Sequence, residues 1–474
     1  MIETGTAIKA RRTRPAMRGL AMLTAVAIAA AGGGPALERA RAQEQPSRGL
    51  PLIRDTEIEQ LLRDYATPIL RAAGLAQQNV RVVVLNDRSF NAFVMDGRHI
   101  FVNAGALFEA KTPNEVIGIF AHETGHLAGG HLLRLREKLA EAQTQSIIAL
   151  LAGVGAMVAA GRSGNADVGA GPILAPQQSI QRSLLAYVRT QEDQADHAGV
   201  KFLTLTHQSG RGMLELFKRL SNEMLFSLSR ADPYLQTHPL PPDRVAALEV
   251  LVKSSPYYDV KDPPELQLRH DLMRAKLSGF LEAPGTVARR YPPSDHSLPA
   301  RYARAISTYR FGDLRQAIPQ LDGLIEAEPN NPFFQELKGQ ALLEGGHPAE
   351  AVPPLRRAAQ LASHPALIQI MLGQALIATN NAKNAEEAVG LLRSAIAREP
   401  EASNAYAELA MAYGRKGDVA NADLAAAQAA FNRGDMTTAK QLAARAKTRL
   451  AVGSPAWVQA DDIVNVKMPS AKNN

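Results

Sequence analysis

The sequence predicts a mainly α protein, made of an α+β part followed by an all-α array of helices. Two β-rich runs within residues 80–102 come before a helix that is capped at 112–115, which indicates a small sheet packed beside that helix. Beyond residue 300 the chain repeats with a period of 34 residues, which is typical of stacked helix pairs. A chain of 474 residues is long enough for about two to four domains.

The first 42 residues are predicted to be a signal peptide. They combine a basic start with an apolar stretch from Gly19 to Ala31, and we expect cleavage after Ala42. Cleavage implies export to the bacterial periplasm, and a chain with no cysteine suits that oxidising compartment. An uncleaved anchor is the alternative, although this stretch is short for a membrane span. Because the leader carries most of the net charge of +7, the rest of the chain gives no electrostatic indication of a nucleic-acid partner.

The β-rich runs are Val80–Leu85 and Ile100–Val102, and Asp96-Gly97 between them is a hairpin-turn signal. A small sheet beside a helix leaves an edge that an extended polypeptide can join as an added strand. Because such pairing uses the backbone, it shows little preference for particular side chains.

The helix that follows carries the most informative motif of the chain, His122-Glu123-Thr124-Gly125-His126. Thr112-Pro113-Asn114-Glu115 is typical of a capping box with proline at the first helical position. Histidines four residues apart share one helix face, so both imidazoles can hold the same zinc ion while Glu123 acts as a base on water. The alternative is two surface histidines that flank a salt-bridging glutamate.

A zinc site of this type needs a third protein ligand. We reject His131, because on a continuing helix it would face about 180° away from His122. Glu192 and Asp196 are better candidates, since they are four residues apart on a predicted helix at 179–200 and share one face. One carboxylate can bind the metal and the other can fix a ligand imidazole, whereas a solvated acidic helix face is the alternative.

Together these motifs resemble the metallopeptidase family of the CAAX prenyl proteases and HtpX. The order of H-E-x-x-H and E-x-x-A-D-x-x-G carries the resemblance, and the segments Asn91–Gly105 and Thr237–Arg244 extend it over residues 80–250. The resemblance implies that Glu192 is the third zinc ligand. For Thr237–Arg244, a proline-rich turn with an incidental histidine is the alternative.

We therefore expect a zinc metalloendopeptidase that binds one zinc per chain. The expected ligands are His122, His126 and Glu192, and Asp196 is expected to support a ligand imidazole. Glu123 is expected to take the proton of the attacking water. His238 and Arg244 are candidates for stabilising the tetrahedral intermediate. His238 has a rival role, because its imidazole can instead fill the open coordination position and keep the enzyme latent.

A second apolar stretch, residues 147–160, falls short of the roughly 20 residues of a membrane span. We expect a buried helix or a flap over the site, with peripheral membrane contact as the alternative. The following segment, 161–178, is rich in Gly, Ser and Pro and is expected to be a flexible loop.

The repeats are visible where Gly339-Gln340-Ala341-Leu342 recurs 34 residues later as Gly373-Gln374-Ala375-Leu376, and three extra residues at 380–383 interrupt the series. This is the tetratricopeptide period, and a generic alanine-rich bundle is the alternative. The predicted domains are a zinc metallopeptidase domain at 43–265, a tetratricopeptide domain at 266–460 and a C-terminal tail at 461–474. Repeats of this type present a concave surface to protein partners.

The order of signal peptide, zinc peptidase and repeats is similar to that of the periplasmic β-barrel assembly-enhancing proteases of Gram-negative bacteria. This resemblance implies degradation of misfolded or stalled outer-membrane proteins, help in their assembly, and the barrel assembly machinery as a partner of the repeats. A non-proteolytic holdase with a structural zinc is the first alternative, and the intact Glu123 argues against it. A membrane-anchored housekeeping protease is the second.

Overall fold

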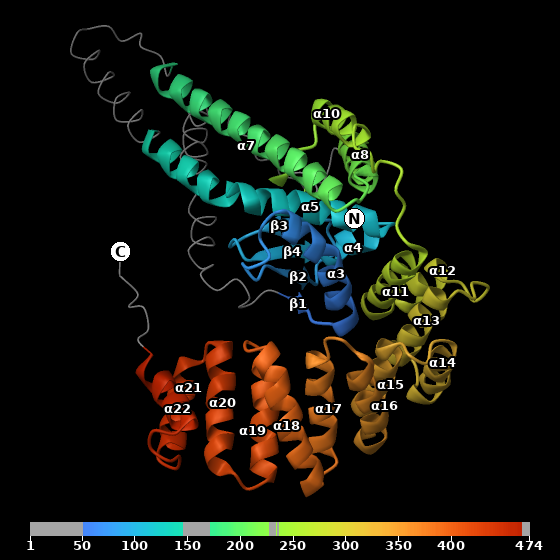
Figure 1. Cartoon of the computed structure of the whole chain (residues 1–474), viewed down its shortest axis with the longest axis vertical. Helices are drawn as coiled ribbons and strands as arrows, with labels where there is room; N and C mark the ends of the chain where they lie inside the picture. The colour runs from blue at the N-terminus through green and yellow to red at the C-terminus, as the bar shows by residue number, and fades with distance from the viewer. Residues whose placement is uncertain (1–50, 146–170, 227–233, 235–236, 467–474) are drawn as a thin grey trace, which may run out of the picture. The chain divides into compact units, whose positions relative to one another are not determined.

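The computed structural model describes residues 51–145, 171–226, 234 and 237–466. Within them the protein is mainly helical with one small sheet, which confirms the predicted fold class (Figure 1). The predicted signal peptide and the apolar stretch 147–160 lie outside the described residues. Among the helices that the structure describes, none combines the length and apolarity that crossing a membrane requires.

The sheet has four strands in the order β1-β2-β4-β3. They are β1 Leu52–Ile53, β2 Arg81–Leu85, β3 Ala92–Val94 and β4 His99–Asn103. The two predicted β-rich runs form β2 and β4, which pair in parallel, whereas β3 pairs antiparallel with β4. The turn at Asp96-Gly97 joins β3 to β4: Gly97 has a φ of 75°, and Asp96 Oδ1 accepts hydrogen bonds from the backbone N–H groups of residues 98 and 99. The short β3 is therefore an edge strand of this sheet.

Helix α5 is the centre of the first part of the chain. The other helices of this part include α3 Thr56–Ala72, α4 Ala104–Glu109, α7 Gly171–Leu205, α8 Arg211–Phe226 and α10 Pro242–Lys253. Helix α5 itself spans Pro113–Gly129, and every residue from 113 to 125 is buried. It contacts α3, α7, α8 and the strands β3 and β4, so it is covered by the sheet on one side and by helices on the other (Figure 1). Such complete burial suits a helix with an apolar first half and explains why its polar side chains must find partners inside the protein.

One prediction for this part is wrong. Residues 171–178 were expected to belong to a flexible loop, yet α7 already begins at Gly171. Glycine and proline lower helix propensity only as a local preference, which the rest of the fold can override, so their content at 171–178 did not mark a loop.

The remaining chain forms consecutive helices. They are α11 Pro264–Leu281, α12 Pro284–Arg290, α13 Leu298–Phe311, α14 Leu314–Ala327, α15 Pro332–Glu344, α16 Pro348–Leu361, α17 Ala366–Ala378, α18 Ala382–Arg398, α19 Ser403–Arg415, α20 Val419–Arg433, α21 Met436–Lys447 and α22 Pro455–Asn465. From α13 onward they pack as neighbouring pairs (Figure 1). The first three pairs begin at residues 298, 332 and 366, which matches the predicted period of 34.

The three extra residues predicted at 380–383 lengthen α18 at its start. Gly339 of α15 lies against Leu355, and the equivalent Gly373 of α17 lies against Leu392, so the packing partners are 37 residues apart while the glycines are 34 apart. Glycine at these positions lets the helices approach closely. The predicted domain boundaries fall at the beginning of α11 and within α22, and they remain predictions.

Candidate metal centre

The centre begins with the close approach of α5 and α7. A Cβ atom added at Gly125 would lie 2.7 Å from the carbonyl oxygen of Ala195, and one at Gly199 would lie 3.2 Å from the backbone nitrogen of His122. The two helices therefore meet backbone to backbone at glycine positions. This contact brings the carboxylates on α7 within reach of the imidazoles on α5.

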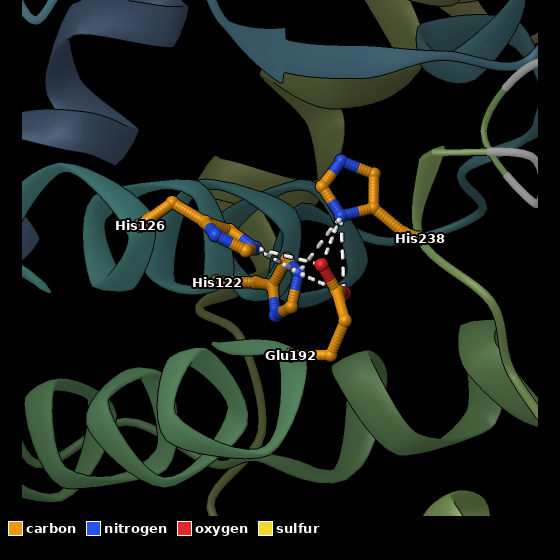
Figure 2. Close-up of side chains that lie close together, drawn as sticks. All are labelled: His122, His126, Glu192 and His238. Carbon is orange, nitrogen blue, oxygen red and sulfur yellow. Dashed lines mark hydrogen bonds and ion pairs between the residues drawn. The ribbon is translucent and has the colours of Figure 1, made fainter. Parts of the chain in front are cut away.

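Four side chains converge at this contact, as Figure 2 shows: His122 and His126 from α5, Glu192 from α7, and His238 from the segment before α10. One potential ligand atom from each lies within 4.8 Å of all the others. The Nε2 atoms of His122 and His126 are 3.1 Å apart, and each lies 3.4 Å from a carboxylate oxygen of Glu192. Two or three imidazoles and one carboxylate form a typical donor set for zinc, so the residues present fit the predicted metal.

His238 completes this group. Its Nδ1 atom is 3.1 Å from both carboxylate oxygens of Glu192 and 3.5 Å from Nε2 of His122. Its other ring nitrogen, Nε2, is 3.7 Å from Oε1 of Glu123. The imidazole of His238 therefore lies between the cluster and Glu123.

Glu123 is fully buried, and neither of its carboxylate oxygens has a hydrogen-bond partner among the described residues. Burial raises the pKa of this carboxyl above its ordinary value, while the histidines His238 and His122 partly offset the effect. A buried carboxyl with unused hydrogen-bonding capacity costs stability, so it is the type of group that a protein retains for a chemical role.

Asp196 and Arg244 surround the cluster with ion pairs. Oδ1 of Asp196 is 2.9 Å from Nδ1 of His122, the ring nitrogen that faces away from the other ligands. The guanidinium of Arg244 donates to both oxygens of Asp196, at 2.7 and 2.9 Å, and its Nη1 lies 2.9 Å from Glu192. The same Nη1 donates to the carbonyl of Pro239, the residue after His238. Arg244 thus links three elements of the site, and its Nε, Nη1 and Nη2 all donate to protein acceptors.

The pKa values follow from this arrangement. Burial opposes the charged form of His122, but the close carboxylates of Asp196 and Glu192 outweigh it and raise the pKa of His122 to about 9. Burial acts against ionisation of Glu192 as well, yet the surrounding histidines hold the pKa of its carboxyl far below the usual range. Burial and the neighbouring His122 lower the pKa of His126. The cluster therefore attracts positive charge, which a divalent cation can supply in place of a proton.

Every residue singled out from the sequence as a ligand, base or supporting group meets here: His122, Glu123, His126, Glu192, Asp196, His238 and Arg244. His131 was rejected as a ligand and does not belong to the ligand cluster, but the sequence reasoning missed its contact with His126. Helix α5 does not continue past Gly129, because Gly130 adopts the left-handed conformation with φ of 63° and ψ of 27°. The expectation that His131 faces away is therefore wrong, and its Nδ1 lies 3.0 Å from Nδ1 of His126. The Gly129-Gly130 pair was the available signal.

Comparison with known proteins agrees with this geometry. The model of Peptidase family M48 matches residues 53–252, which include all the residues of the centre. Residues 53–252 are therefore similar to the peptidases of family M48. Peptidases of this family are metal-dependent, and the described residues include a His/Glu cluster able to hold a metal ion.

The most similar relatives include beta-barrel assembly-enhancing proteases. The protein from Escherichia coli K12 is 22% identical over 337 residues, and the match covers 69% of this chain and 66% of the relative. The protein from Yersinia pestis is 22% identical over 344 residues, covering 69% and 67%. A relative from Vibrio cholerae, which carries this name provisionally, is 25% identical over 289 residues, covering 60% of this chain. The match spans only 58% of the Vibrio protein's own length.

Proposed function

We propose that this protein is a zinc-dependent endopeptidase. The observation that carries the proposal is the fully buried carboxyl of Glu123, whose oxygens have no hydrogen-bond partner among the described residues and lie beside a cluster of metal-binding side chains. His122, His126 and Glu192 would hold one zinc ion per chain, and zinc supplies Lewis acidity when bound. Glu123 takes a proton from water, and its raised pKa suits a base that must later return that proton.

Asp196 and Arg244 support the ligands in this proposal. The contact between Asp196 Oδ1 and His122 Nδ1 fixes the ring so that Nε2 points at the cluster. Since the guanidinium of Arg244 is engaged by Asp196, Glu192 and a backbone carbonyl, we infer that it positions these groups and does not contact the substrate.

His238 is proposed to hold the resting state. With Nδ1 3.1 Å from Glu192 and 3.5 Å from His122, its imidazole occupies a fourth ligand position that a substrate needs. Replacement of His238 by alanine should then increase proteolysis while it weakens zinc binding. A loss of proteolysis at unchanged zinc content would instead assign His238 to stabilisation of the intermediate.

Polypeptides are the proposed substrates. The edge strand β3 contacts α5, so an extended chain that pairs with β3 would pass beside the helix that carries the metal centre. The names of the relatives support a role in the cell envelope, where the protease would degrade misfolded or stalled outer-membrane proteins and assist their assembly. The helix pairs after residue 266 are proposed to be tetratricopeptide repeats that bind the barrel assembly machinery. Export to the periplasm after cleavage at Ala42 belongs to the same proposal.

The test of enzymatic function compares Glu123→Gln with wild type and with Glu137→Gln, a matched change at an exposed position after α5. Metal analysis and cleavage of casein are measured on each purified mature chain. We expect about one zinc in all three proteins and loss of cleavage only in Glu123→Gln, because the base is lost while the ligands remain. Cleavage by Glu123→Gln at a rate close to wild type would mean that Glu123 is not the base. Zinc without any cleavage in the wild type would favour the holdase alternative with a structural zinc.

A further inference from the structure

The chain after α5 is shaped to place one imidazole. Gly130 reverses the backbone in the left-handed conformation, and its N–H bonds to the carbonyls of His126 and Leu127. The ring of His131 then lies directly over Gly129, at a distance that a side chain there would not permit. His131 is only 3% exposed, so two consecutive glycines together allow a buried histidine to pack against the end of α5.

This imidazole meets His126 on the side away from the metal cluster. The Nδ1 atoms of His131 and His126 are 3.0 Å apart, and the two rings are nearly perpendicular at 83°. The opposite nitrogen of His126, Nε2, is the one that lies 3.1 Å from Nε2 of His122 and 3.4 Å from Glu192. His131 itself is therefore not in the ligand group, although it touches a member of that group.

The hydrogen-bond direction follows from the chemistry of imidazole. A neutral histidine that binds a metal through Nε2 carries its single proton on Nδ1, so His126 must donate and His131 must accept. His122 has the same arrangement, since Asp196 faces its Nδ1 atom. Each of the two histidine ligands thus has one partner for its outer nitrogen, a carboxylate for His122 and an imidazole for His126.

Helix α7 holds His131 in this position. The side chain of Gln191 donates to the backbone carbonyl of His131 at 3.3 Å, and Gln194 lies on the same helix close enough to influence the pKa of the ring. Both glutamines flank Glu192, so the helix that supplies the carboxylate ligand also orients the support of the second imidazole ligand.

We propose that His131 is a positioning residue that fixes the tautomer and orientation of His126 for metal binding. The inference rests on the proposed zinc site. The proposed role depends on Nδ1 of His131 as a hydrogen-bond acceptor. Variants that keep or remove an acceptor at this place therefore distinguish a positioning role of the side chain from a role in packing.

The experiment compares His131→Asn, which keeps an acceptor near the place of Nδ1, with His131→Leu and His131→Phe, which fill the space without one. The surface change His197→Leu on α7 is the control. Zinc affinity is measured on the mature full chain by competition with a chelator, ligand geometry by the absorption spectrum of the cobalt-substituted protein, and packing by the melting temperature of the metal-free protein. We expect Leu and Phe to weaken zinc binding about 10- to 100-fold and to change the cobalt spectrum, with Asn and the control close to wild type.

Zinc affinity and cobalt spectra that are unchanged in Leu and Phe would overturn the inference. Equal losses in Asn, Leu and Phe that parallel their melting temperatures would also overturn it, because the effect would then be packing alone. If wild type itself bound no zinc, the proposed function would fail first and the inference with it.

Discussion

Replacement of Gly125 by alanine should damage the metal centre without touching any ligand. Gly125 lies between Glu123 and His126 on α5, where an added Cβ would be 2.7 Å from the carbonyl oxygen and 3.0 Å from the Cα of Ala195. Ordinary van der Waals contact begins at 3.4 Å, so α5 and α7 would have to separate locally by about 0.7 Å. Since the obstacle is backbone, no side-chain rotation can relieve it.

Two opposing effects set the magnitude. Alanine in a helix interior is favoured over glycine by about 1 kcal/mol, whereas overpacking of a close contact costs about 1–3 kcal/mol. Because the obstacle at Gly125 is rigid, we expect a net loss of about 1–2 kcal/mol. Gly390 in α18 is the matched control, since an added Cβ there meets nothing within 4 Å, and Gly390→Ala should stabilise the protein by about 1 kcal/mol.

Zinc binding should respond more strongly than stability. Ala195 is one helical turn from Glu192, and metal–ligand distances tolerate deviations of only about 0.2 Å. A displacement of about 0.7 Å should therefore weaken zinc affinity at least about tenfold. The assays are thermal unfolding of the metal-free protein and zinc competition for wild type, Gly125→Ala and Gly390→Ala. If Gly125→Ala were stabilised like the control and bound zinc normally, the close helix contact could not be what positions Glu192.

Three further predictions concern Arg244 at the centre, the buried carboxyl of Glu336 in α15, and the repeats. Arg244→Lys should lower zinc affinity about 10-fold or more, because one ammonium cannot bridge both oxygens of Asp196 and also reach Glu192. A fall in the cleavage rate with normal zinc affinity would instead indicate that Arg244 contacts the reacting groups. Burial raises the pKa of Glu336 from 4.5 to about 7, so its contribution to stability is complete below pH 4.5 and is lost as the pH rises through 7. Relative to Glu336→Gln, the wild type should lose about 2 kcal/mol of unfolding free energy between pH 5.5 and 8, as measured by urea unfolding. A difference between the two proteins that does not depend on pH would contradict the assignment. Deletion of residues 300–474 should leave zinc bound in metal analysis but abolish pull-down of envelope partners, and capture of the same partners by the truncated chain would reduce the repeats to a structural extension.

The sequence predicted those features that depend on local spacing. Histidines four residues apart share a face whatever the rest of the fold does, and the same holds for Glu192 and Asp196. The 34-residue period needs only the repetition of close-packing glycines such as Gly339 and Gly373, and the turn at Asp96-Gly97 is set by its own backbone.

Other features depend on where an element ends and which distant segment it meets. The glycine pair Gly129-Gly130 could indicate either a close helix contact or the end of α5. His131 would face opposite sides of α5 in these two cases. The start of α7 at Gly171 was hidden by glycine and proline content that also describes a loop. The bonds of Arg244 to Asp196 and Glu192 join positions about fifty residues apart, and such ion pairs have no signature in a single sequence.

The placement of His238 connects the proposed resting state to the proposed chemistry. One nitrogen of its ring lies against Glu192 and the other lies 3.7 Å from Glu123, so the imidazole separates the base from the ligand cluster. A movement of His238 away from Glu192 would therefore open a ligand position and the approach to Glu123 at the same time. Arg244 holds the carbonyl of Pro239, next to His238, with the same guanidinium that orients Asp196 and Glu192. Arg244 holds Asp196 through Nε and Nη2 without using the Nη1 bond to Pro239, so in the proposed function Asp196 would stay in place if His238 moved. This one imidazole would then separate the proposed latent centre from the active one.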